Sequence, residues 1–512
     1  DTKGTGQADQ RTAVATDFGT AGGQPEHMAN TPVWALDNTV YAAGYGTGLR
    51  LKAGAWLRGP GLGRGQWGLC QDDFGRLFYN YNSDLLRADL LPAPAYARNP
   101  LLRNAAGLNH PVMTDQSVYP SHPTPGVNRG YDAKTLRDDG TLAKATATCG
   151  AVVYRGDAYP TDYRGNAFVP EPSVNLVKRL LLNEQDGVIK ATDGAKGREF
   201  LTSTDERFRP VQVVNGPDGC LYVVDMYRGI VQHTAFLTHY LEANIKARHL
   251  EQPFNQGRIW RIVPEGGRKV ARTAIPADNA SRVKLLTHAD GWVRDTAQRL
   301  LVEAGDAAVG PALKALATDA QAPALGRLHA LWTLDGLGLV DAPLIQAALR
   351  DTRPQVRAAA RVIEQLLSEQ NDDRVLGRLD TVLIEGARVT LRDSVSGLSW
   401  TAPDAKARLK RDATGVVIEA DARFSNLGDP IVVSVAGNYS RDRSHITLES
   451  RLEGVRPSQF ADLTPDAAIL RGLDLPLAAR LRVEANGSGE IESINADLVG
   501  TNGRHYLYQR AR

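Results

Sequence analysis

The feature that most constrains the fold of this chain is the period of its hydrophobic pattern, which changes twice along the sequence. Up to about residue 265, short apolar or aromatic runs follow polar turns that contain Gly or Asn. From about 281 to 368, apolar residues recur with the helical period and Ala and Leu dominate. Beyond about 375 the pattern alternates with a period of two. We therefore expect a multidomain, mainly β protein with a helical middle part.

The first part repeats one phrase, a polar turn followed by a short strand. Its four copies are LDNTVYAAG at 36–44, DDFGRLFYNYN at 72–82, DYRGNAFVPEP at 162–172 and GPDGCLYVVD at 216–225. Turns followed by alternating strands are typical of antiparallel blades, and uneven recurrence over roughly 40 to 90 residues is typical of propeller blades with insertions. The 49 glycines and 27 prolines also favour turn-rich β structure. We expect a β-propeller over residues 1–267.

One helix interrupts this region. Apolar residues recur at three- to five-residue spacing between 233 and 250, which predicts a helical insertion. The phrase GRIWRIVPEGG at 257–267 predicts the last strand. Residues 268–280 are interpreted as a linker that ends in a helix-capping Asp278 or Asn279.

Residues 281–370 predict a short α-solenoid. The apolar positions Val293, Leu325 and Val356 repeat at about 31 to 32 residues, each inside a helix that follows a turn containing Asp or Pro. This pattern is typical of stacked helix pairs and resembles about three HEAT repeats. Solenoids of this kind present extended binding surfaces, so we expect any protein partner to bind here.

Residues 375–512 predict an antiparallel β domain with one apolar face. That face comprises Val416, Ile418, Ala420, Ala422 and Phe424 in one strand, Ile431, Val433, Val435 and Tyr439 in the next, and Ile446, Leu448 and Leu452 in a third. Further strands are expected around 481–483 and 491–494. An apolar face of this size needs a cover or holds something apolar. We expect the segment 460–477 to form a short helix and a loop that cap it.

Charge and cysteine content exclude several classes of protein. In 512 residues, 60 basic and 58 acidic side chains leave a formal charge of +2, so nothing indicates a nucleic-acid or anionic-membrane partner. No stretch approaches the roughly 20 consecutive apolar residues that span a bilayer. The cysteines Cys70, Cys149 and Cys220 form no CxxC or CxxCH motif, which leaves no zinc knuckle and no haem attachment site. We expect buried or partly buried free thiols; the alternative is one disulfide with one odd thiol.

The first 368 residues resemble a known family. The phrases that carry the resemblance are PEHMANTPVWALDN, RGQWGLCQDDFGRLFYNYNSDLLRADL, PGVNRGYD, REFLTSTDERFRPV and GPDGCLYVVDMYRGIVQH. They resemble the membrane-bound dehydrogenase-like propellers of planctomycetes and verrucomicrobia, which are relatives of the soluble quinoprotein sugar dehydrogenases and are commonly followed by HEAT-like repeats. The opening DTKGTGQAD is similar to the family's DxDGDGxAD turn, but Lys3 and Thr5 stand where carboxylates would be. Because family members carry more propeller before this turn, we expect a partial β-propeller.

A second resemblance covers about residues 375–512. The runs GLSWTAPDAKARLKRDATGVVIEADARF and SHITLESRLEGVRPSQFADLTPDAAILRGLDLPLAARLRVEANGSGEI resemble AsmA-like envelope proteins. In that family a β-groove is associated with lipid handling, so the resemblance implies lipid as a partner of the C-terminal domain. Both resemblances imply a periplasmic or cell-envelope location in a bacterium.

The first resemblance implies a reaction and its cofactor. Quinoprotein dehydrogenases oxidise a sugar or an alcohol by hydride transfer to pyrroloquinoline quinone (PQQ), which calls for a base and for cations that bind the quinone's carboxylates. His27 precedes a blade strand and is the candidate base. Arg129 in GVNRGY and Arg228 in DMYRG are the candidate carboxylate ligands, because a planar guanidinium binds two oxygens at once.

Polar groups next to these strands complete the candidate site. Asn80 and Asn82 in NYNSD are candidate contacts of the cofactor, of sugar hydroxyls or of a metal. Asp84 and Asp225 are the candidate Ca²⁺ ligands. For each of these candidates, the alternative is a hydrogen bond that fixes a loop or a surface salt bridge. The charge run at 205–207 is interpreted as a solvated face.

Two functions remain open at this point. The first is a quinoprotein-like oxidoreductase of the cell envelope that acts on a sugar or alcohol. The second is a non-catalytic envelope scaffold in which propeller, solenoid and β domain are all binding surfaces. Absent blades would leave the propeller's funnel with an open side, so enzymatic activity is left undecided by the sequence.

Overall fold

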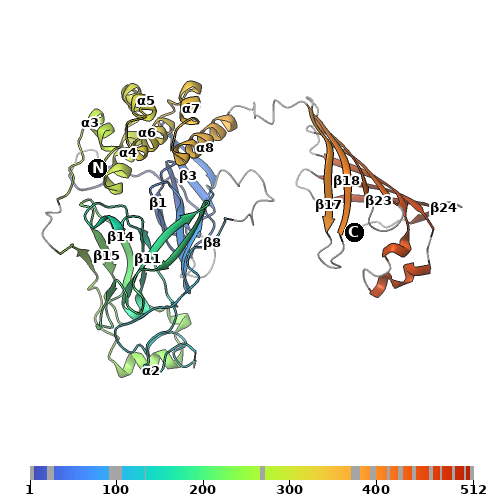
Figure 1. Ribbon diagram of the computed structural model, residues 1–512. Helices are drawn as coiled ribbons and strands as arrows, with labels where there is room; N and C mark the ends of the chain where they lie inside the picture. The colour runs from blue at the N-terminus through green and yellow to red at the C-terminus, as the bar shows by residue number, and fades with distance from the viewer. Residues whose placement is uncertain are drawn as a thin grey trace. The chain divides into compact units, whose positions relative to one another are not determined.

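The computed structural model describes residues 5–19, 28–91, 107–132, 134–265, 271–370, 381–392, 399–411, 415–424, 430–440, 445–460, 465–472, 475–486, 491–500 and 503–507. The chain divides into two compact units, Asp1–Leu366 and Leu367–Arg512. The first unit combines antiparallel sheets with a helical stretch, and the second contains one large antiparallel sheet (Figure 1). No helix among the described residues is long and apolar enough to cross a membrane.

Four antiparallel sheets build the β part of the first unit, and in each the strands follow one another almost in sequence order. The first sheet contains β1 (Asn30–Trp34), β2 (Thr39–Ala43), β3 (Thr47–Lys52) and β4 (Ala55–Pro60). The second contains β5 (Trp67–Gln71), β6 (Leu77–Tyr81), β7 (Asp84–Asp89) and β8 (His110–Pro111).

The third sheet contains β9 (Val152–Val153), β10 (Ala167–Glu171), β11 (Leu176–Gln185) and β12 (Val188–Asp193), with β13 (Leu201–Thr202) beside β11. The fourth contains β14 (Pro210–Asn215), β15 (Leu221–Asp225) and β16 (Arg258–Ile262). The first strands of successive sheets are neighbours, because β5 contacts both β1 and β9, and β9 contacts β14. The described residues form no closed propeller.

The repeated phrase of the sequence is the turn that opens the second strand of each sheet, since β2, β6, β10 and β15 all lie inside a copy. In three copies one aspartate, Asp37, Asp72 or Asp218, organises the turn. One carboxylate oxygen accepts a hydrogen bond from the backbone N–H two residues on, at 2.9–3.1 Å. The other accepts from the side chain four residues on, which is Tyr41, Arg76 or Tyr222. The strands predicted from these phrases are therefore confirmed.

The helical stretch follows the sheets and lies across one end of them (Figure 1). Its helices are α3 (Asn279–Leu285), α4 (Gly291–Ala304), α5 (Gly310–Thr318), α6 (Ala324–Gly336), α7 (Ala342–Ala348) and α8 (Pro354–Gln370). Short 3-10 turns accompany the unit at η3 (Thr161–Tyr163), η4 (Pro172–Val174), η5 (Thr234–Phe236) and η6 (Ala307–Val309). Asp278 caps α3 by accepting from the Ser281 N–H at 2.7 Å, as predicted.

A buried network of charges joins α4 to the sheets. The guanidinium of Arg155, which follows β9, donates to Asp295 of α4 at 2.6 Å and to Asp73 at 2.8 Å. Arg294 of α4 also pairs with Asp73. Burial alone would raise the pKa of Asp73, but Arg155 and Arg294 hold that pKa below its usual range.

A second set of buried polar groups joins the β1–β2 turn to α4 and α6. Asn38 donates to the Trp332 carbonyl at 2.7 Å and accepts from Gln298 at 2.8 Å. The oxygen of Gln298 is 2.7 Å from Nδ1 of His329. Burial, aided by the charge of Arg294, lowers the pKa of His329 to about 3, so this ring is neutral. The sheets and the helices therefore share one continuous interior.

The second unit is an eight-stranded antiparallel sheet in strict sequence order. Its strands are β17 (Thr381–Arg392), β18 (Ser399–Arg411), β19 (Gly415–Phe424), β20 (Ile431–Ser440), β21 (His445–Val455), β22 (Leu477–Asn486), β23 (Ile491–Gly500) and β24 (Gly503–Leu507). Two 3-10 segments, η8 (Pro457–Phe460) and η9 (Pro465–Gly472), lie between β21 and β22.

The register confirms the predicted apolar face of this sheet. Val416 pairs with Tyr439 and Phe424 with Ile431, and the same face continues across β21 and β22. Ile418 and Leu448 on this face keep 43% and 40% of their surface exposed. The expectation that 460–477 caps the sheet is therefore wrong for the described residues, because η9 leaves these side chains open to solvent.

Candidate functional site

A cavity of about 380 Å³ lies where the first strands of the four sheets meet, and we call it the central cavity. The sheets contribute Asn30 and Thr31 of β1, Trp67 and Gly68 of β5, Gly150 just before β9, and Val211 and Gln212 of β14. Loops at 126–128, 146–147, 172–173 and 226–232 complete its wall. Helix α2 (His239–Ala247), which lies at the end of the sheets opposite the helical stretch (Figure 1), contributes Leu241 and Ile245 to the wall.

One wall of the central cavity is apolar. Thr238 caps α2 by accepting from the Leu241 N–H, so Leu241 and Ile245 lie one turn apart on the face that lines the cavity. Ile230, Val231, Leu237 and Leu250 extend this wall. The hydroxyl of Tyr240 donates to the Pro125 carbonyl at 2.6 Å, which fixes the helix against the loop before the cavity. The opposite wall is polar and contains Asn30, Asn82, Thr146, Ser173 and Gln212.

Arg209 supplies a buried positive charge to the cavity wall. Its guanidinium donates to the carbonyls of Pro172, Ser173 and Gly229 at 2.6–3.0 Å and to that of Arg228 at 3.1 Å. No carboxylate among the described residues lies within salt-bridge distance of it. Burial lowers the pKa of Arg209 to about 10, so the group remains protonated at neutral pH. A cation whose direct hydrogen bonds all go to carbonyl oxygens can attract an anion that enters the cavity.

Arg248 adds a second cation to the same wall. It follows α2 and pairs with Glu206 at 2.5 Å, and it also donates to the Asn244 carbonyl at 3.2 Å. Its Nη2 lies against Gly126, where an added Cβ would come within 1.7 Å of that nitrogen. Glycine at 126 therefore leaves the room that the guanidinium of Arg248 occupies.

A buried carboxyl group lies behind the polar wall. Both oxygens of Glu171 accept from the Ala147 N–H at 3.0–3.1 Å, and Ser173 Oγ donates to one of them. Ala147 and Ser173 line the central cavity. Complete burial raises the pKa of Glu171 to about 7, against the stabilising effect of these donors. This carboxyl therefore changes its charge near neutral pH.

Replacing Glu171 with Gln is expected to change how stability depends on pH. A carboxyl whose pKa is raised by folding stabilises the folded state below its unfolded pKa, and that contribution is lost as pH rises toward 7. At about 1.4 kcal/mol per tenfold change in proton affinity, the loss is on the order of 3 kcal/mol. Denaturant unfolding near pH 5 and pH 8 measures it: Glu171→Gln is expected to gain stability relative to the native chain on going to pH 8.

A substitution that changes no titratable group provides the control, because Val188→Ala at an exposed side chain is expected to keep a constant difference from the native chain at both pH values. A pH-independent difference for Glu171→Gln as well would contradict the raised pKa of this carboxyl.

The cysteines are free, as expected from the sequence. Cys149 lines the central cavity, whereas Cys70 and Cys220 are buried elsewhere. Burial, reinforced by the nearby Glu171, raises the pKa of Cys149. Its sulfur is therefore a thiol and not a nucleophilic thiolate at neutral pH.

The sequence-predicted cofactor ligands divide into those at the cavity and those beside it. Asn82 lines it, and its Oδ1 accepts from Trp67 Nε1 at 2.7 Å. Asn80 is fully buried behind the wall, where it donates to the Cys149 carbonyl. Arg129 is exposed, and the guanidinium of Arg228 lies 5.3 Å from the ring centre of Phe254. The side chains of these two arginines are not part of the cavity wall, although their neighbours Asn128 and Gly229 are.

The predicted metal ligands have separate structural roles. The Asp225 carboxylate accepts from the backbone N–H groups of Arg209 and Tyr227, both at 2.8 Å, and from Trp260 Nε1 at 3.0 Å. Asp84 pairs with Arg87. The described residues contain no group of three or more His, Cys, Asp or Glu side chains that could hold a metal ion. The predicted base, His27, lies outside the described residues.

The charge run at 205–207 is not the solvated face that the sequence suggested. Its side chains are partly buried, Glu206 pairs with Arg248, and Arg207 donates to the carbonyls of His249 and Gln252 at 2.8 and 3.0 Å. The run therefore holds the segment that follows α2. Sequence reasoning missed Arg209, Arg248 and Glu171; for Arg209, a basic residue directly before a strand was the available signal.

These features define the class of protein: it is multidomain and mainly β, with a ligand-sized cavity where its sheets meet. The sequence profile of DUF7133, a domain of unknown function, matches residues 1–266. Because that match covers more than half of the 512 residues, the chain belongs to the DUF7133 family. No curated protein and no solved structure matches the chain.

Proposed function

We propose that residues 1–266 form a quinoprotein-like oxidoreductase of the cell envelope, which oxidises a sugar or alcohol with PQQ held in the central cavity. The observation that carries the proposal is the pair of guanidinium groups, Arg209 and Arg248, in the wall of this cavity. The carboxylates of the quinone would meet the buried charge of Arg209, which has no direct carboxylate partner among the described residues. The apolar wall of α2 would lie against its flat rings.

The arrangement of the sheets supports the same proposal. Four consecutive antiparallel meanders with adjacent first strands are the pattern of consecutive blades, and we interpret them as a partial β-propeller. The central cavity then takes the place of the propeller's funnel. The following helices, in which α4, α6 and α8 carry the repeated apolar positions, are interpreted as HEAT-like repeats.

The chain's own residues would bind and orient the reactants. When PQQ is bound, it supplies an acceptor for the hydride that the alcohol carbon gives up. The alcohol also loses its hydroxyl proton to a base and becomes a carbonyl compound. His27 is the proposed base, three residues before the cavity-lining Asn30. Asn82 and Gln212 can position substrate hydroxyls with their amide groups. Asp84 and Asp225 do not fit a Ca²⁺ site, so no step relies on that ion.

Calorimetric titration of the purified chain with PQQ tests the proposal. Arg248→Ala and Gly126→Ala are expected to weaken binding roughly 10- to 100-fold, since hydrogen bonds to charged groups contribute about 1.5–3 kcal/mol. Gly126→Ala keeps the charge and displaces the guanidinium. Arg129→Ala and Arg228→Ala are the matched controls and are expected to bind normally. His27→Ala is expected to bind PQQ but to lose dye-linked oxidation of sugars and alcohols.

The titration results distinguish the quinoprotein function from the non-catalytic scaffold and show which arginine binds PQQ. A folded native chain that does not bind PQQ would rule out the quinoprotein function and favour the non-catalytic envelope scaffold. Weaker binding in Arg228→Ala, with Arg248→Ala unchanged, would indicate that PQQ is bound by Arg228, as predicted from the sequence, and not by Arg248.

A second candidate function belongs to the C-terminal unit. The exposed apolar face of its sheet, seen at Ile384, Ile418 and Ile494, favours an AsmA-like association with lipid. Co-sedimentation with vesicles of the zwitterionic lipid phosphatidylcholine tests it. Ile418→Lys on this face is expected to reduce binding, and Val417→Lys on the opposite face is the control. Equal retention of both variants would count against a lipid-binding face.

A further inference from the structure

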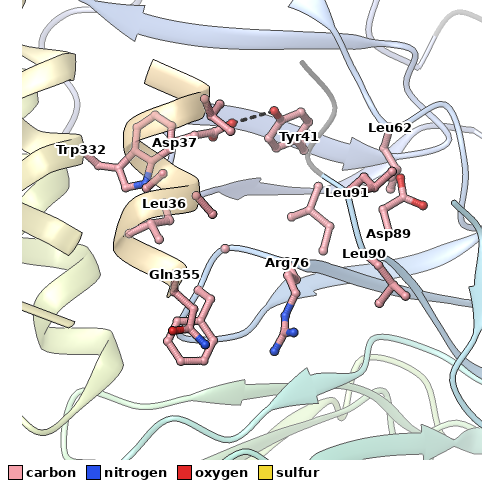
Figure 2. Close-up of a pocket in the computed structure, with 16 residues that line it drawn as sticks. Leu36, Asp37, Tyr41, Leu62, Arg76, Asp89, Leu90, Leu91, Trp332 and Gln355 are labelled. Atoms are coloured by element: carbon pink, nitrogen blue, oxygen red, sulfur yellow. Dashed lines mark hydrogen bonds between the residues drawn. The ribbon is translucent and has the colours of Figure 1, made fainter. Parts of the chain in front are cut away.

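A second cavity, of about 190 Å³, lies between the sheets and the helical stretch of the first unit, and Figure 2 shows it. The turn and strand β2 of the first sheet, the β5–β6 turn and the end of β7 in the second sheet, and helices α6 and α8 all contribute to its wall. Its residues are distinct from those of the central cavity. We call it the junction pocket.

Most of the junction pocket is hydrocarbon. Leu36, Leu62 and Leu77 come from the β part, and Ala359 and Val362 come from α8. An engineered cavity of about 150 Å³ with a similar lining binds benzene. A pocket of 190 Å³ therefore has room for one ring with a short substituent.

The wall of the junction pocket also carries hydrogen-bond acceptors. The carboxylate of Asp37 accepts from the Tyr41 hydroxyl at 2.8 Å, as Figure 2 shows, and from the Thr39 N–H at 3.1 Å. Burial raises the pKa of Asp37. Each carboxylate oxygen of Asp37 therefore has one donor and keeps a lone pair that can accept from a ligand. Gln355 of α8 lines another part of the pocket, and its Oε1 is buried with no hydrogen-bond partner among the described residues.

The other charged groups in the wall are neutralised within the chain. Asp89 pairs with Arg64 and accepts from the Tyr79 hydroxyl at 2.8 Å. Arg76 pairs with Asp72 and with Glu184, both at 2.6 Å.

Asp37 has no such ion pair within the described part of the chain. Arg50, whose charge partly offsets the effect of burial on the pKa of Asp37, donates to the Asp37 backbone carbonyl at 3.3 Å and forms its ion pair with Asp335. Burial favours the neutral form of Asp37, and a cation in the pocket would favour the carboxylate.

We propose that the junction pocket binds a small organic cation, a primary ammonium carried on a single ring or a short branched hydrocarbon. The ammonium donates to the Asp37 carboxylate, and the hydrocarbon lies among the leucines and the residues of α8. The indole of Trp332, which also lines the pocket, offers an aromatic group to the cation. This site does not depend on the function proposed for the central cavity.

Binding at this position connects the two parts of the first unit. The wall contains residues of two sheets and of α6 and α8, so a ligand contacts the β part and the helices at once. A ligand that binds only the folded chain raises its stability by mass action. Benzylamine is therefore expected to raise the midpoint of thermal unfolding by an amount that grows with the logarithm of one plus the ratio of its concentration to its Kd.

Calorimetry near pH 8 with four one-ring probes tests the proposal. Benzylamine is expected to bind the native chain with a Kd of about 1 mM, as is usual for a ligand of this size. Benzyl alcohol and toluene, which lack the charge, and benzoate, which reverses it, are expected to bind at least tenfold more weakly. Failure to bind benzylamine, or equal binding of benzoate, would overturn the proposal.

Two variants locate the site. Asp37→Asn keeps the size of the side chain and its ability to form the turn, and it is expected to weaken benzylamine binding roughly 10- to 100-fold. Ala359→Phe fills the pocket from α8 and is expected to abolish binding with Asp37 intact. Unfolding transitions show that each variant is folded. Arg248→Ala, in the central cavity, is the control and is expected to bind benzylamine normally. Unchanged binding in Asp37→Asn or in Ala359→Phe would contradict the assignment.

Discussion

Replacing Arg155 with Ala is expected to lower the free energy of unfolding of the first unit by about 3 to 5 kcal/mol. The side chain of Arg155 is 5% exposed and bridges Asp73 of the β part to Asp295 of α4. Its removal leaves two carboxylates in a buried site with one fewer cation, and the desolvation cost of those charges is no longer offset. Chemical denaturation of the native and variant chains measures the difference.

The control for this experiment is Arg361→Ala. Arg361 pairs with Glu364 on α8, but its side chain is 63% exposed, and exposed pairs of this kind contribute about 0.5 kcal/mol. The Arg155 variant is also expected to keep a single unfolding transition, because the sheets and helices share one interior. A small loss of stability, or separate transitions for helix and sheet, would contradict the role assigned to this network.

Replacing Gly68 with Ala is expected to destabilise the first unit by about 3 kcal/mol or more. A Cβ at this position would come within 2.3 Å of the Gly150 Cα, where the first strands of the second and third sheets approach each other. Backbone atoms cannot rotate away as a side chain can, so the two sheets would have to separate. The measurement is again denaturant unfolding.

Gly187 offers a matched control. Its φ of +77° is almost the same as the +78° of Gly68, but an added Cβ there meets nothing within 4 Å. Gly187→Ala therefore reports only the strain of a left-handed backbone, about 1 to 2 kcal/mol. The difference between the two variants isolates the contact between sheets. Equal destabilisation of both would show that the first strands are not held at this spacing.

The sequence predicted the elements of this fold better than their assembly. The second strand of every sheet could be found because the turn before it leaves a local pattern of residue types, and in three sheets that turn is organised by an aspartate such as Asp218. The helices and the C-terminal strands followed from their periods, which depend on neighbours in the chain. The contact between Gly68 and Gly150 has no local signature, since the two residues lie on different sheets.

The difference between local patterns and the assembly of distant segments also explains why the sequence predicted an arginine that does not line the candidate site. Arg228 and Arg209 both lie near strands of the fourth sheet, and both are arginines next to turns or strands. Arg209 reaches the cavity because its backbone precedes β14, the innermost strand, whereas the guanidinium of Arg228 lies beside Phe254. The path of the folded chain decides which of these two arginines lines the cavity. The sequence pattern alone does not show that path.

The residues of the central cavity wall come from the whole β part of the first unit, so the cavity forms only when that part is folded. Asn30 of the first sheet and Leu250 beyond α2 both belong to it, and every sheet contributes segments in between. Contacts between such distant parts of a chain form late in folding, because long loops must close first. A fragment with one or two of the sheets would therefore have no cavity. Ligand binding there reports that the entire β part of the first unit is assembled.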